Sequence, residues 1–314
     1  METGILVIHP GALGDVLQAV PALRGLRAVA PGAPITFVGQ PRLARLLVEL
    51  GAAQRARAFE RFGLEALFVD GPVPTTLAEA VGGVRYAVSW FGSRDETYGR
   101  RLRALVPRAV IAPPVPDEAT PVWRHLLGTL AGWDLALPER VEPLRAPPPA
   151  ADEVSLRPRL VVHPGSGGDW KRWPAERFAE VIHALRHRRA VDVLVHQGPA
   201  DAEAAQRLLA LLERDAGTLV EPELPRLAAV LGAAAAYLGG DSGVSHLAAT
   251  VGAPSVVLFP PATRRRWAPW SPAAMPIELT GTDRDIEHAI AALEGVLGRK
   301  PARGGLTTDP APEG

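Results

Sequence analysis

The sequence predicts an α/β protein made of two doubly wound, Rossmann-like domains that face each other across a cleft. Short apolar segments alternate with segments of helical periodicity through most of the chain, which is typical of βαβ units and a parallel sheet. The pattern apolar-apolar-His-Pro-Gly-x-x-Gly-Asp occurs twice, as VIHPGALGD from Val7 and as VVHPGSGGD from Val161. The length of 314 residues exceeds what one hydrophobic core usually supports, so two domains of about 150 residues are expected.

The first domain is expected to span residues 1–150. Five short apolar segments are predicted to be strands, at 5–8, 35–38, 66–69, 86–90 and 109–112. The segments around them have helical periodicity and predict helices at 15–30, 42–50, 75–81, 98–105 and 121–131, with Pro21 kinking the first. Segment 138–158 is rich in proline, polar and aperiodic, as expected of a linker between domains.

The same alternation begins again in residues 151–300, which are expected to form the second domain. Strands are predicted at 160–163, 191–196, 218–220, 235–238 and 255–259, and helices at 174–188, 200–214, 224–231, 242–251 and 283–297. Residues 301–314 are expected to be a disordered tail. The repeated HPGxxGD peptide then becomes the first strand-to-helix turn of each domain, where ligands of such sheets bind.

Composition narrows the classes of function. The chain has 34 basic and 34 acidic residues, which argues against a general nucleic-acid binder and requires a local cluster for any anionic ligand. It has no cysteine, which excludes disulfides and thiolate metal sites and suits the cytoplasm. The first residues lack the basic and apolar regions of a secretory signal, and the longest apolar stretch, 227–238, is too short to cross a bilayer.

The stretch SGGDWKRWPAERF, which begins at Ser166, is a candidate phosphate-binding turn. Its two glycines free the backbone, Lys171 and Arg172 supply cationic donors, and Pro174 suits the first position of a helix. The alternative is a solvated basic loop before an ordinary helix. Only Lys171 and Lys300 are lysines in a chain that otherwise uses arginine, and this favours a functional Lys171.

The stretch LGGDSGVSHLAATVG, residues 238–252, is a second candidate. The backbone amides of Ser242, Gly243 and Val244 could face an anionic ligand, with the dipole of a small-residue helix behind them. In the alternative interpretation Asp241 or Ser242 caps the helix and His246 packs on its next turn. The two interpretations are compatible.

Asp15, in GALGDVLQAVPAL, is a third candidate. It stands where the first helix begins and could act as a general base toward a hydroxyl group. As a lone aspartate it is more simply explained as the N-cap of that helix, and the pattern alone does not decide.

Two further patterns carry less weight. Asp283 and Asp285 resemble a carboxylate pair that holds a metal, yet the surrounding TDRDIEHAI is also an ordinary acidic helix start. His183 and His187 share a helix face without an evident third ligand, so a solvated face is expected. No metal site is therefore predicted.

Taken together, these motifs resemble glycosyltransferase family 9, the ADP-heptose:lipopolysaccharide heptosyltransferases and their relatives. The resemblance rests on PGALGDVLQAVPALRGLR, VVHPGSGGDWKRWPAERFAEVI, QGPADAE and LAAVLGAAAAYLGGDSGVSHLAATVGAPSVVLF, in this order. It implies the GT-B architecture, in which two Rossmann-like domains enclose a cleft. It also implies an inverting transfer without a metal ion, with Asp15 as the general base and Lys171 holding the donor diphosphate.

The resemblance extends to further residues of the site. Asp201 is expected near the donor nucleoside, and the donor sugar and phosphates are expected near a group that follows the fourth strand of the second domain: Asp241, Ser242, Gly243 and His246. Ser166 and Arg172 complete the expected donor-binding set. Acceptor contacts are expected from the first domain, at Gly14, Arg94 and Arg101.

The chain departs from the family at two places. Relatives commonly carry an aspartate in the loop after the last strand of this series, whereas FPPATRRRW here places arginines at Arg264, Arg265 and Arg266. This puts the donor or the loop geometry in question. His9 stands where an arginine is frequent, which bears on handling of the acceptor.

The predicted function is transfer of a sugar, heptose from ADP-heptose above all, onto the lipopolysaccharide core or a related envelope glycan. The expected partners are a nucleotide-sugar donor and a lipid-linked or core glycan acceptor, with no cofactor and no nucleic acid. The expected location is the cytoplasm, with peripheral contact at the inner face of the inner membrane. Two alternatives stay open: an isomerase that resembles the nucleotide-sugar 2-epimerases, and a non-catalytic nucleotide-sugar binding protein.

Overall fold

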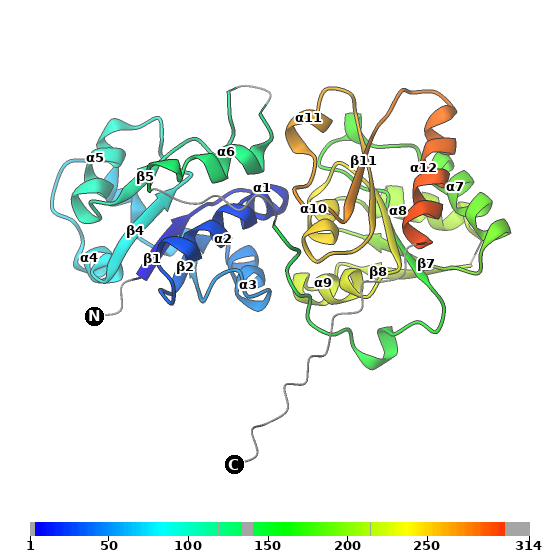
Figure 1. Ribbon diagram of the computed structural model, residues 1–314, viewed down its shortest axis with the longest axis horizontal. Helices are drawn as coiled ribbons and strands as arrows, with labels where there is room; N and C mark the ends of the chain where they lie inside the picture. Colours follow the sequence, from blue (N-terminus) through cyan, green and yellow to red (C-terminus); the bar gives the residue numbers. More distant parts are fainter. Residues whose placement is uncertain (1–3, 118–119, 134–140, 214, 299–314) are drawn as a thin grey trace, which may run out of the picture.

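The computed structural model describes residues 4–117, 120–133, 141–213 and 215–298, which form two parallel α/β halves (Figure 1). The predicted tail at 301–314 and residues 138–140 of the predicted linker lie outside the described residues. Segment 141–158 connects the halves and contains one short 3-10 turn, Ala151–Glu153. Within the described residues, no helix is both long and apolar enough to span a bilayer.

The first half contains five strands and their connecting helices. In chain order these are β1 (Gly4–Ile8), α1 (Leu13–Gln18), α2 (Val20–Val29), β2 (Ile35–Gly39), α3 (Pro41–Glu49), β3 (Arg55–Ala58), α4 (Thr75–Val81), β4 (Val84–Ser89), α5 (Glu96–Leu105), β5 (Ala109–Ile111) and α6 (Val122–Gly128). Short 3-10 helices lie at Phe59–Arg61, Leu64–Leu67 and Ala131–Trp133. The strands pair in parallel in the order β3-β2-β1-β4-β5.

The second half contains six parallel strands in the order β11-β10-β9-β6-β7-β8. Its elements are β6 (Arg159–His163), α7 (Ala175–Arg188), β7 (Asp192–Gln197), α8 (Ala202–Leu211), β8 (Ala216–Val220), α9 (Leu224–Gly232), β9 (Ala236–Gly240), α10 (Gly243–Thr250), β10 (Ser255–Phe259), α11 (Arg264–Trp267), β11 (Ala274–Glu278) and α12 (Arg284–Leu297). The strand order reverses direction beside β1 in one sheet and beside β6 in the other, so both halves are doubly wound.

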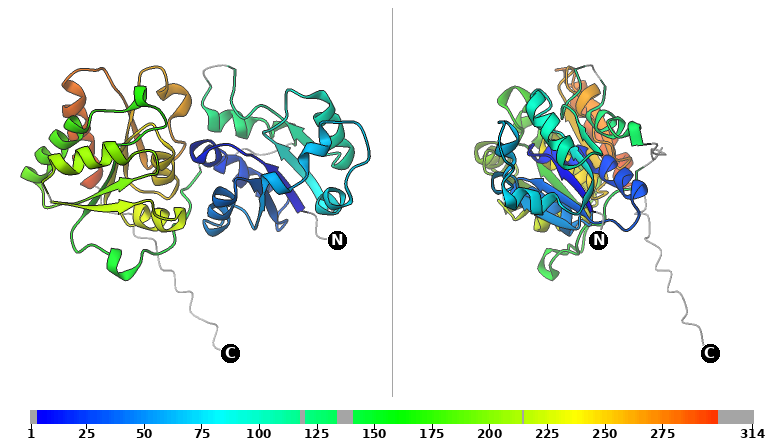
Figure 2. Two further views of the ribbon diagram at one scale, coloured as in Figure 1. Left: turned by 180° about the vertical axis from the view of Figure 1, so that it is seen from behind. Right: turned by 90° about the vertical axis from the view of Figure 1, so that its left-hand side faces the viewer.

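The buried side chains form layers on both faces of each sheet. One cluster lies between the first sheet and helices α4 and α5, where Leu6 and Ile8 of β1 meet Leu77 and Tyr98. Another lies between the second sheet and helices α7, α8 and α12. The remaining cluster is shared, because it joins β1 and helices α1, α2, α3 and α6 to α9, α10 and the facing side of the second sheet. The two halves are therefore packed against one another through a continuous apolar layer (Figures 1 and 2).

At the centre of this layer, the starts of α1 and α10 approach each other closely. A Cβ atom on Gly14 of α1 would lie 3.0 Å from Cδ2 of His246, and one on Gly243 of α10 would lie 3.0 Å from Cβ of Leu13. Glycine at both positions permits this approach, since any side chain would push the helices apart. The approach places the N-terminal turns of α1 and α10 side by side.

Hydrogen bonds between α1 and the segment formed by α11 and the loop after it stabilise the same contact. Trp270 donates its indole Nε1–H to the carbonyl of Leu17 at 2.9 Å, and Gln18 donates from Nε2 to the carbonyl of Trp267 at 3.3 Å. Both bonds join α1 of the first half to the second half, so they stabilise the association of the two halves.

The predicted fold class is confirmed, and most of the predicted elements are found within two residues of their expected ends. The strand predicted at 66–69 is wrong, because Leu64–Leu67 forms a 3-10 helix whose Leu64 and Leu67 pack on the cluster beside α4 and α5. The third strand is instead Arg55–Ala58, at the edge of the sheet. A strand at the edge of a sheet is more exposed to solvent and so has a weaker apolar pattern. The same reason explains why the edge strand β11, which contains Pro276, was not predicted.

The two copies of the repeated peptide have different local structures. The first copy forms the predicted turn from β1 into α1. The second copy leaves β6, forms a 3-10 turn over Asp169–Lys171, and reaches α7 only at Ala175. Asp169 is consequently exposed and paired with Arg172 at 2.9 Å, so it does not repeat the placement of Asp15.

A leucine at Gly14 is expected to separate α1 from α10 and to lower the free energy of unfolding by about 1–3 kcal/mol, as overpacking of a filled site does. Gly128→Leu is the matched control, because a Cβ at Gly128 meets no atom within 4 Å and the position is an exposed helical one. Chemical denaturation of both variants measures the difference. Equal stability of the two variants would contradict the close approach of the helices.

Candidate functional site

The residues predicted to carry chemistry gather where the strand order of each sheet reverses. Asp15 follows β1 in the first half, whereas Lys171 follows β6 and Asp241 follows β9 in the second. In open α/β sheets the crevice beyond the carboxyl ends of such strands is the usual ligand site. Because α1 follows β1 and α10 follows β9, the contact between these helices brings the carboxyl ends of the two sheets near each other.

Asp15 occupies the third position of α1, and the predicted N-cap role is wrong, because α1 begins at Leu13 with Ala12 as its N-cap. The Asp15 carboxylate accepts the backbone N–H of Ala12 at 3.0 Å. Burial raises the pKa of Asp15, against opposing effects of the Ala12 hydrogen bond and the positive charge of Lys171. The positive charge of Lys171 acts on Asp15 although the two residues belong to different halves of the chain.

Lys171 is held by a buried carboxylate. Its Nζ lies 2.9 Å from Oδ2 of Asp241, which is 5% exposed, and 5.3 Å from the ring centroid of Trp170. The lysine side chain keeps 22% of its surface exposed, so its charge is fixed in place and still reaches the cleft. A cation held in this way is suited to an anionic ligand.

The N-terminus of α10 lies beside this pair. Ser242 is the N-cap, and its Oγ accepts the backbone N–H of Ser245 at 3.3 Å, which confirms one of the two capping residues considered. Gly243 and Val244, in the first turn, have no intrahelical partner for their N–H groups. Together with the helix dipole, these amides favour a negative charge at this point.

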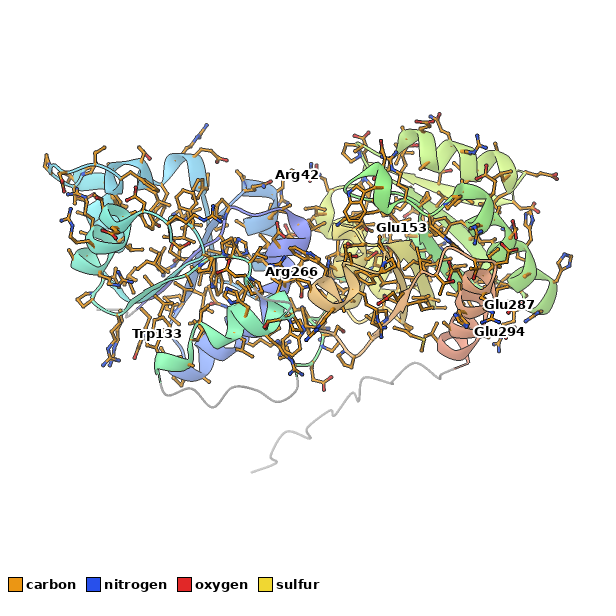
Figure 3. The ribbon with its side chains drawn as sticks, turned by 90° about the horizontal axis from the view of Figure 1, so that it is seen from above. Arg42, Trp133, Glu153, Arg266, Glu287 and Glu294 are labelled. Carbon is orange, nitrogen blue, oxygen red and sulfur yellow. The ribbon has the colours of Figure 1, made fainter. Side chains whose placement is uncertain are left out.

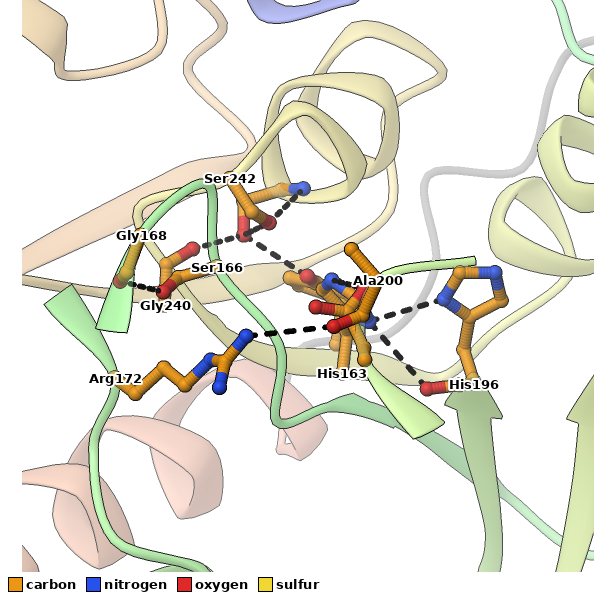
Figure 4. A network of polar contacts seen from close by, with 11 residues as sticks. His163, Ser166, Gly168, Arg172, His196, Ala200, Gly240 and Ser242 are labelled. Atoms are coloured by element: carbon orange, nitrogen blue, oxygen red, sulfur yellow. Dashed lines mark hydrogen bonds and ion pairs between the residues drawn. The ribbon is translucent and has the colours of Figure 1, made fainter. Parts of the chain in front are cut away.

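The glycine-rich turn after β6 is tied down from several sides (Figure 4). Ser166 donates its hydroxyl to the carbonyl of Gly168 at 2.7 Å, and Arg172 donates to the carbonyl of Ala200 at 3.3 Å. Asp201 packs so closely on the turn that a Cβ at Gly165 would lie 2.1 Å from its carboxylate. Burial raises the pKa of Asp201, opposed by the charge of Arg172 and by a hydrogen bond from the Ser166 backbone.

A cavity of about 890 Å³ opens beside Asp15 in the first half. It is lined by the carboxyl ends of β1 and β4 and by the loop after β5, including His9, Trp90, Phe91, Arg94 and Val115. His9 is buried, stacks edge-on against Trp90 with ring centroids 5.6 Å apart, and accepts the backbone N–H of Gly11 at Nδ1. The cavity is large enough for a sugar residue and begins directly at the carboxylate.

A second cavity, of about 550 Å³, lies between the halves. Its residues come from α1 and α3 on one side and from the loops after β7 and β8 on the other. They include Ala12, Leu13, Gln40, Arg42, His196, Pro199, Asp201, Glu221, Glu223, Leu224 and Val244. This cavity therefore joins the loop after β7 to the loop after β8.

The remaining predicted residues lie at the contact between the helices or in the first half. Gly14 lies in the contact between α1 and α10, and Gly243 and His246 lie opposite it. Arg101 donates to the carbonyl of Gly71 at 2.8 Å and is not among the residues that line the larger cavity, whereas Arg94 is.

Two of the three arginines of α11, Arg264 and Arg266, form polar contacts with other elements. The guanidinium of Arg266 donates to the carbonyl of Pro116 in the other half, and Figure 3 shows Arg266 at the boundary between the halves. Arg264 lies 3.8 Å from Glu278 of β11. Through Arg266, the arginine-rich segment of the second half is connected to the loop after β5, which lines the larger cavity.

The weaker metal patterns have ordinary explanations. Asp285 is fully buried and accepts the backbone N–H groups of Thr280 at 2.8 Å and of Gly281 at 2.9 Å. His183 and His187 are exposed on α7. In the part of the chain that the structure describes, no three His, Asp or Glu side chains are grouped so as to hold a metal ion.

The sequence matches the model of glycosyltransferase family 9 (heptosyltransferase) over residues 117–289, more than half of the chain. The chain belongs to glycosyltransferase family 9. Among curated proteins of this family, it is 29% identical over 116 residues to lipopolysaccharide heptosyltransferase 3 of Escherichia coli. That alignment covers 36% of this chain and 34% of the relative, so it spans about a third of each.

Solved family 9 structures share the fold of this chain over nearly its whole length. The glycosyltransferase of Veillonella parvula DSM 2008 superimposes with a TM-score of 0.72 at 19% identity, covering 95% of this chain and 98% of that one. The E. coli ADP-heptose lipopolysaccharide heptosyltransferase II gives a TM-score of 0.71 at 22% identity, covering 94% and 98%. E. coli heptosyltransferase WaaC, solved with ADP, gives 0.70 at 18%, covering 93% and 100%. These likenesses establish the GT-B fold.

The sequence analysis of this family 9 chain missed the histidines that surround the glycine-rich turn. His163 ends β6 and His196 lies near the end of β7, and their Nδ1 atoms are 3.0 Å apart in the buried interior. Nε2 of His163 lies 3.6 Å from Oδ2 of Asp201. His163 occupies the same position as His9 in the repeated HPGxxGD peptide, and this repetition could have pointed to a structural role. Nothing in the sequence connects His196 with either residue.

Four buried histidines make the protein sensitive to acid. Burial lowers the pKa of His9, His163 and His246 to about 4 and, with the repulsion of His163 added, that of His196 to about 3. The ordinary pKa is 6.5, so between these values the unfolded chain binds more protons than the folded one. The free energy of unfolding should therefore fall as the pH drops below about 6.5, by up to about 1.4 kcal/mol per pH unit for each histidine.

Denaturant titrations at pH 7.5, 6.5 and 5.5 measure this loss. The exposed His183, replaced by alanine, serves as the control and should leave the pH dependence unchanged, while His163→Asn should reduce it. A free energy of unfolding that stays constant from pH 7.5 to 5.5 would show that these histidines are not buried in the neutral form.

Proposed function

We propose that this protein is an inverting glycosyltransferase that moves heptose from ADP-heptose onto the lipopolysaccharide core or a related envelope glycan. The observation that carries the proposal is the arrangement of Asp15 and Lys171 beyond the carboxyl ends of β1 and β6, the central strands of the two sheets, which the contact between α1 and α10 brings near one another. A base on one wall and a cation on the other are the two groups that sugar transfer from a diphosphate donor requires.

The second half is proposed to hold the donor. Lys171 and the N–H groups at the start of α10 would bind the diphosphate, with Ser166 and Arg172 fixing the turn that carries Lys171. These donors would compensate the charge of the departing diphosphate without a metal ion. The relatives support ADP as the nucleotide, since WaaC was solved with ADP and the heptosyltransferase TibC with ADP-D-beta-D-heptose.

Asp15 is proposed to take the proton of the acceptor hydroxyl. As the hydroxyl oxygen forms its bond to the anomeric carbon, the bond from that carbon to the diphosphate oxygen breaks on the opposite side, which inverts the configuration. The proton passes to Asp15, and the electron pair of the broken bond leaves with the diphosphate. The burial that raises the pKa of Asp15 makes its carboxylate a stronger base than an exposed aspartate.

The acceptor is proposed to enter the larger cavity of the first half. Its aromatic and apolar lining, with Trp90 and Phe91, suits the faces of sugar rings, and Arg94 suits an anionic group on the core glycan. Gly14 and Arg101 do not line this cavity, so their part in binding the acceptor stays a prediction. We propose that the enzyme works in the cytoplasm, in peripheral contact with the inner face of the inner membrane, where a lipid-linked or core glycan acceptor would be reached.

The larger cavity also separates transfer from the alternatives. An isomerase of the 2-epimerase kind works on the donor alone and has no need of about 890 Å³ of space beside the base. A non-catalytic binding protein has no need of a buried carboxylate there. Membership of glycosyltransferase family 9 also favours sugar transfer over these two alternatives.

Replacement of Asp15 by asparagine keeps the acceptor for the Ala12 N–H and removes the base. The expected result is a fall of about 10²–10⁴-fold in kcat for sugar transfer, with the affinity for ADP little changed. Transfer kinetics and calorimetric titration measure the two quantities. A large loss of ADP affinity with kcat preserved would assign Asp15 to donor binding instead.

Replacement of Lys171 by methionine removes the cation and retains most of the side-chain volume. ADP affinity is expected to fall about 10- to 100-fold, as for loss of a charged hydrogen bond, with or without magnesium in the titration. Arg177→Met is the matched control, because Arg177 forms an exposed ion pair with Asp283 outside the cleft. Undiminished ADP binding by the Lys171 variant would contradict the donor site.

A further inference from the structure

The larger cavity is bounded on one side by a stiff loop, residues 112–117, which follows β5. Its sequence, APPVPD, contains three prolines, whose rings fix the backbone φ angle and restrict the residue before each of them. Pro113, Pro114, Val115 and Asp117 of this loop line the cavity. A wall of this kind keeps its own shape, so its position relative to the rest of the cavity depends on the contacts that hold it.

Two side chains hold carbonyl groups of loop 112–117. His125 of α6 donates from Nε2 to the carbonyl of Pro113 at 2.8 Å, and this contact lies within the first half. Arg266 of α11 donates from its guanidinium to the carbonyl of Pro116, and this contact comes from the second half (Figure 3). A guanidinium is always charged, and a charged donor makes the stronger kind of hydrogen bond. The second half therefore fixes one end of the wall.

The segment that carries Arg266 is itself attached to the helix that carries Asp15. Gln18, about one turn after Asp15 on α1, donates from Nε2 to the carbonyl of Trp267 at 3.3 Å. A further hydrogen bond, 2.9 Å long, joins an indole N–H of the loop after α11 to the backbone of α1. Helix α1, the α11 segment and loop 112–117 are thus connected in series. In this series Arg266 is the link between the helix of Asp15 and the wall.

We infer that Arg266 is a positioning residue for the acceptor, because it sets how far the wall formed by loop 112–117 lies from Asp15. The inference rests on the proposed function, since it takes the larger cavity as the acceptor site. Arg266 is not among the described residues that line the cavity, so it acts through Pro116 and does not touch the sugar. Loss of the contact lets the loop move and weakens acceptor binding, while the donor-binding groups keep their places.

Arg266→Met tests this inference, because methionine keeps much of the apolar stem and removes the donors. Arg264→Met is the matched control on the same helix, since the side chain of Arg264 is 47% exposed and lies 3.8 Å from Glu278 of its own half. Arg266→Lys restores a charged N–H donor. Steady-state transfer from ADP-heptose to O-deacylated lipopolysaccharide whose core lacks heptose gives the acceptor KM and kcat. Calorimetric titration gives the Kd for ADP.

Arg266→Met should raise the acceptor KM about 5- to 10-fold, with kcat and the Kd for ADP changed less than about twofold. Arg264→Met should leave all three quantities at their wild-type values, and Arg266→Lys should recover most of the acceptor affinity. An unchanged acceptor KM in Arg266→Met, or an equal rise in Arg264→Met, would overturn the inference. A large loss of ADP affinity in Arg266→Met would also overturn it and assign the residue to the donor.

A measurement without ligand separates the inference from the proposed function. The methyl groups of Val115, in the middle of the loop, report the mobility of the wall through NMR order parameters of the full protein. These should fall in Arg266→Met and stay at the wild-type value in Arg264→Met. Unchanged order parameters in Arg266→Met would overturn the inference. A fall in a protein that transfers no heptose would contradict the proposed function alone and leave Arg266 as the residue that holds the wall.

Discussion

The close approach of α1 and α10 is the constraint on which the rest of the molecule depends. Gly14 and Gly243 allow two helix starts to meet where any Cβ would come within about 3 Å of a neighbour. Around this point the apolar side chains of both halves form one cluster, so neither half buries its inner helices alone. A GT-B cleft is often pictured as a gap between independent domains. Here its floor is a packed core, and the side chains that face the cleft take their positions from it.

That core brings together groups whose charges complement one another. Asp15 is buried enough to raise its pKa, and Lys171, fixed by Asp241, lies near enough to oppose that rise. Two cavities flank these groups: an aromatic one beside Asp15, and one between the halves whose lining includes Asp201, Glu221 and Glu223. A sugar nucleotide has a neutral nucleoside, an anionic diphosphate and a sugar, and this order of environments matches the order of its parts.

The sequence was a good guide wherever one residue or a strict pattern determined the structure. Buried strands with continuous apolar runs, such as β10, were predicted to the residue. Two of the four edge strands, β3 and β11, were not predicted. The exposed Arg55 and Arg57 conceal β3, and a strand at 66–69 was predicted in its place. Within the site, the glycine-rich turn and the start of α10 could be found because glycine and lysine are informative there. The contact of His163 with His196 could not, because it depends on the pairing of β6 with β7 and on side-chain direction.

The most direct test of this account is a structure of the protein with ADP-heptose bound, or with a fluorinated analogue that cannot be transferred. The diphosphate should contact Lys171 and the N–H groups at the start of α10, the nucleoside should lie near Asp201, and the anomeric carbon should face Asp15 beside the larger cavity. A donor whose anomeric carbon faces away from Asp15, or whose phosphates lie outside the reach of Lys171, would contradict the central claim that the two walls of this cleft divide the chemistry.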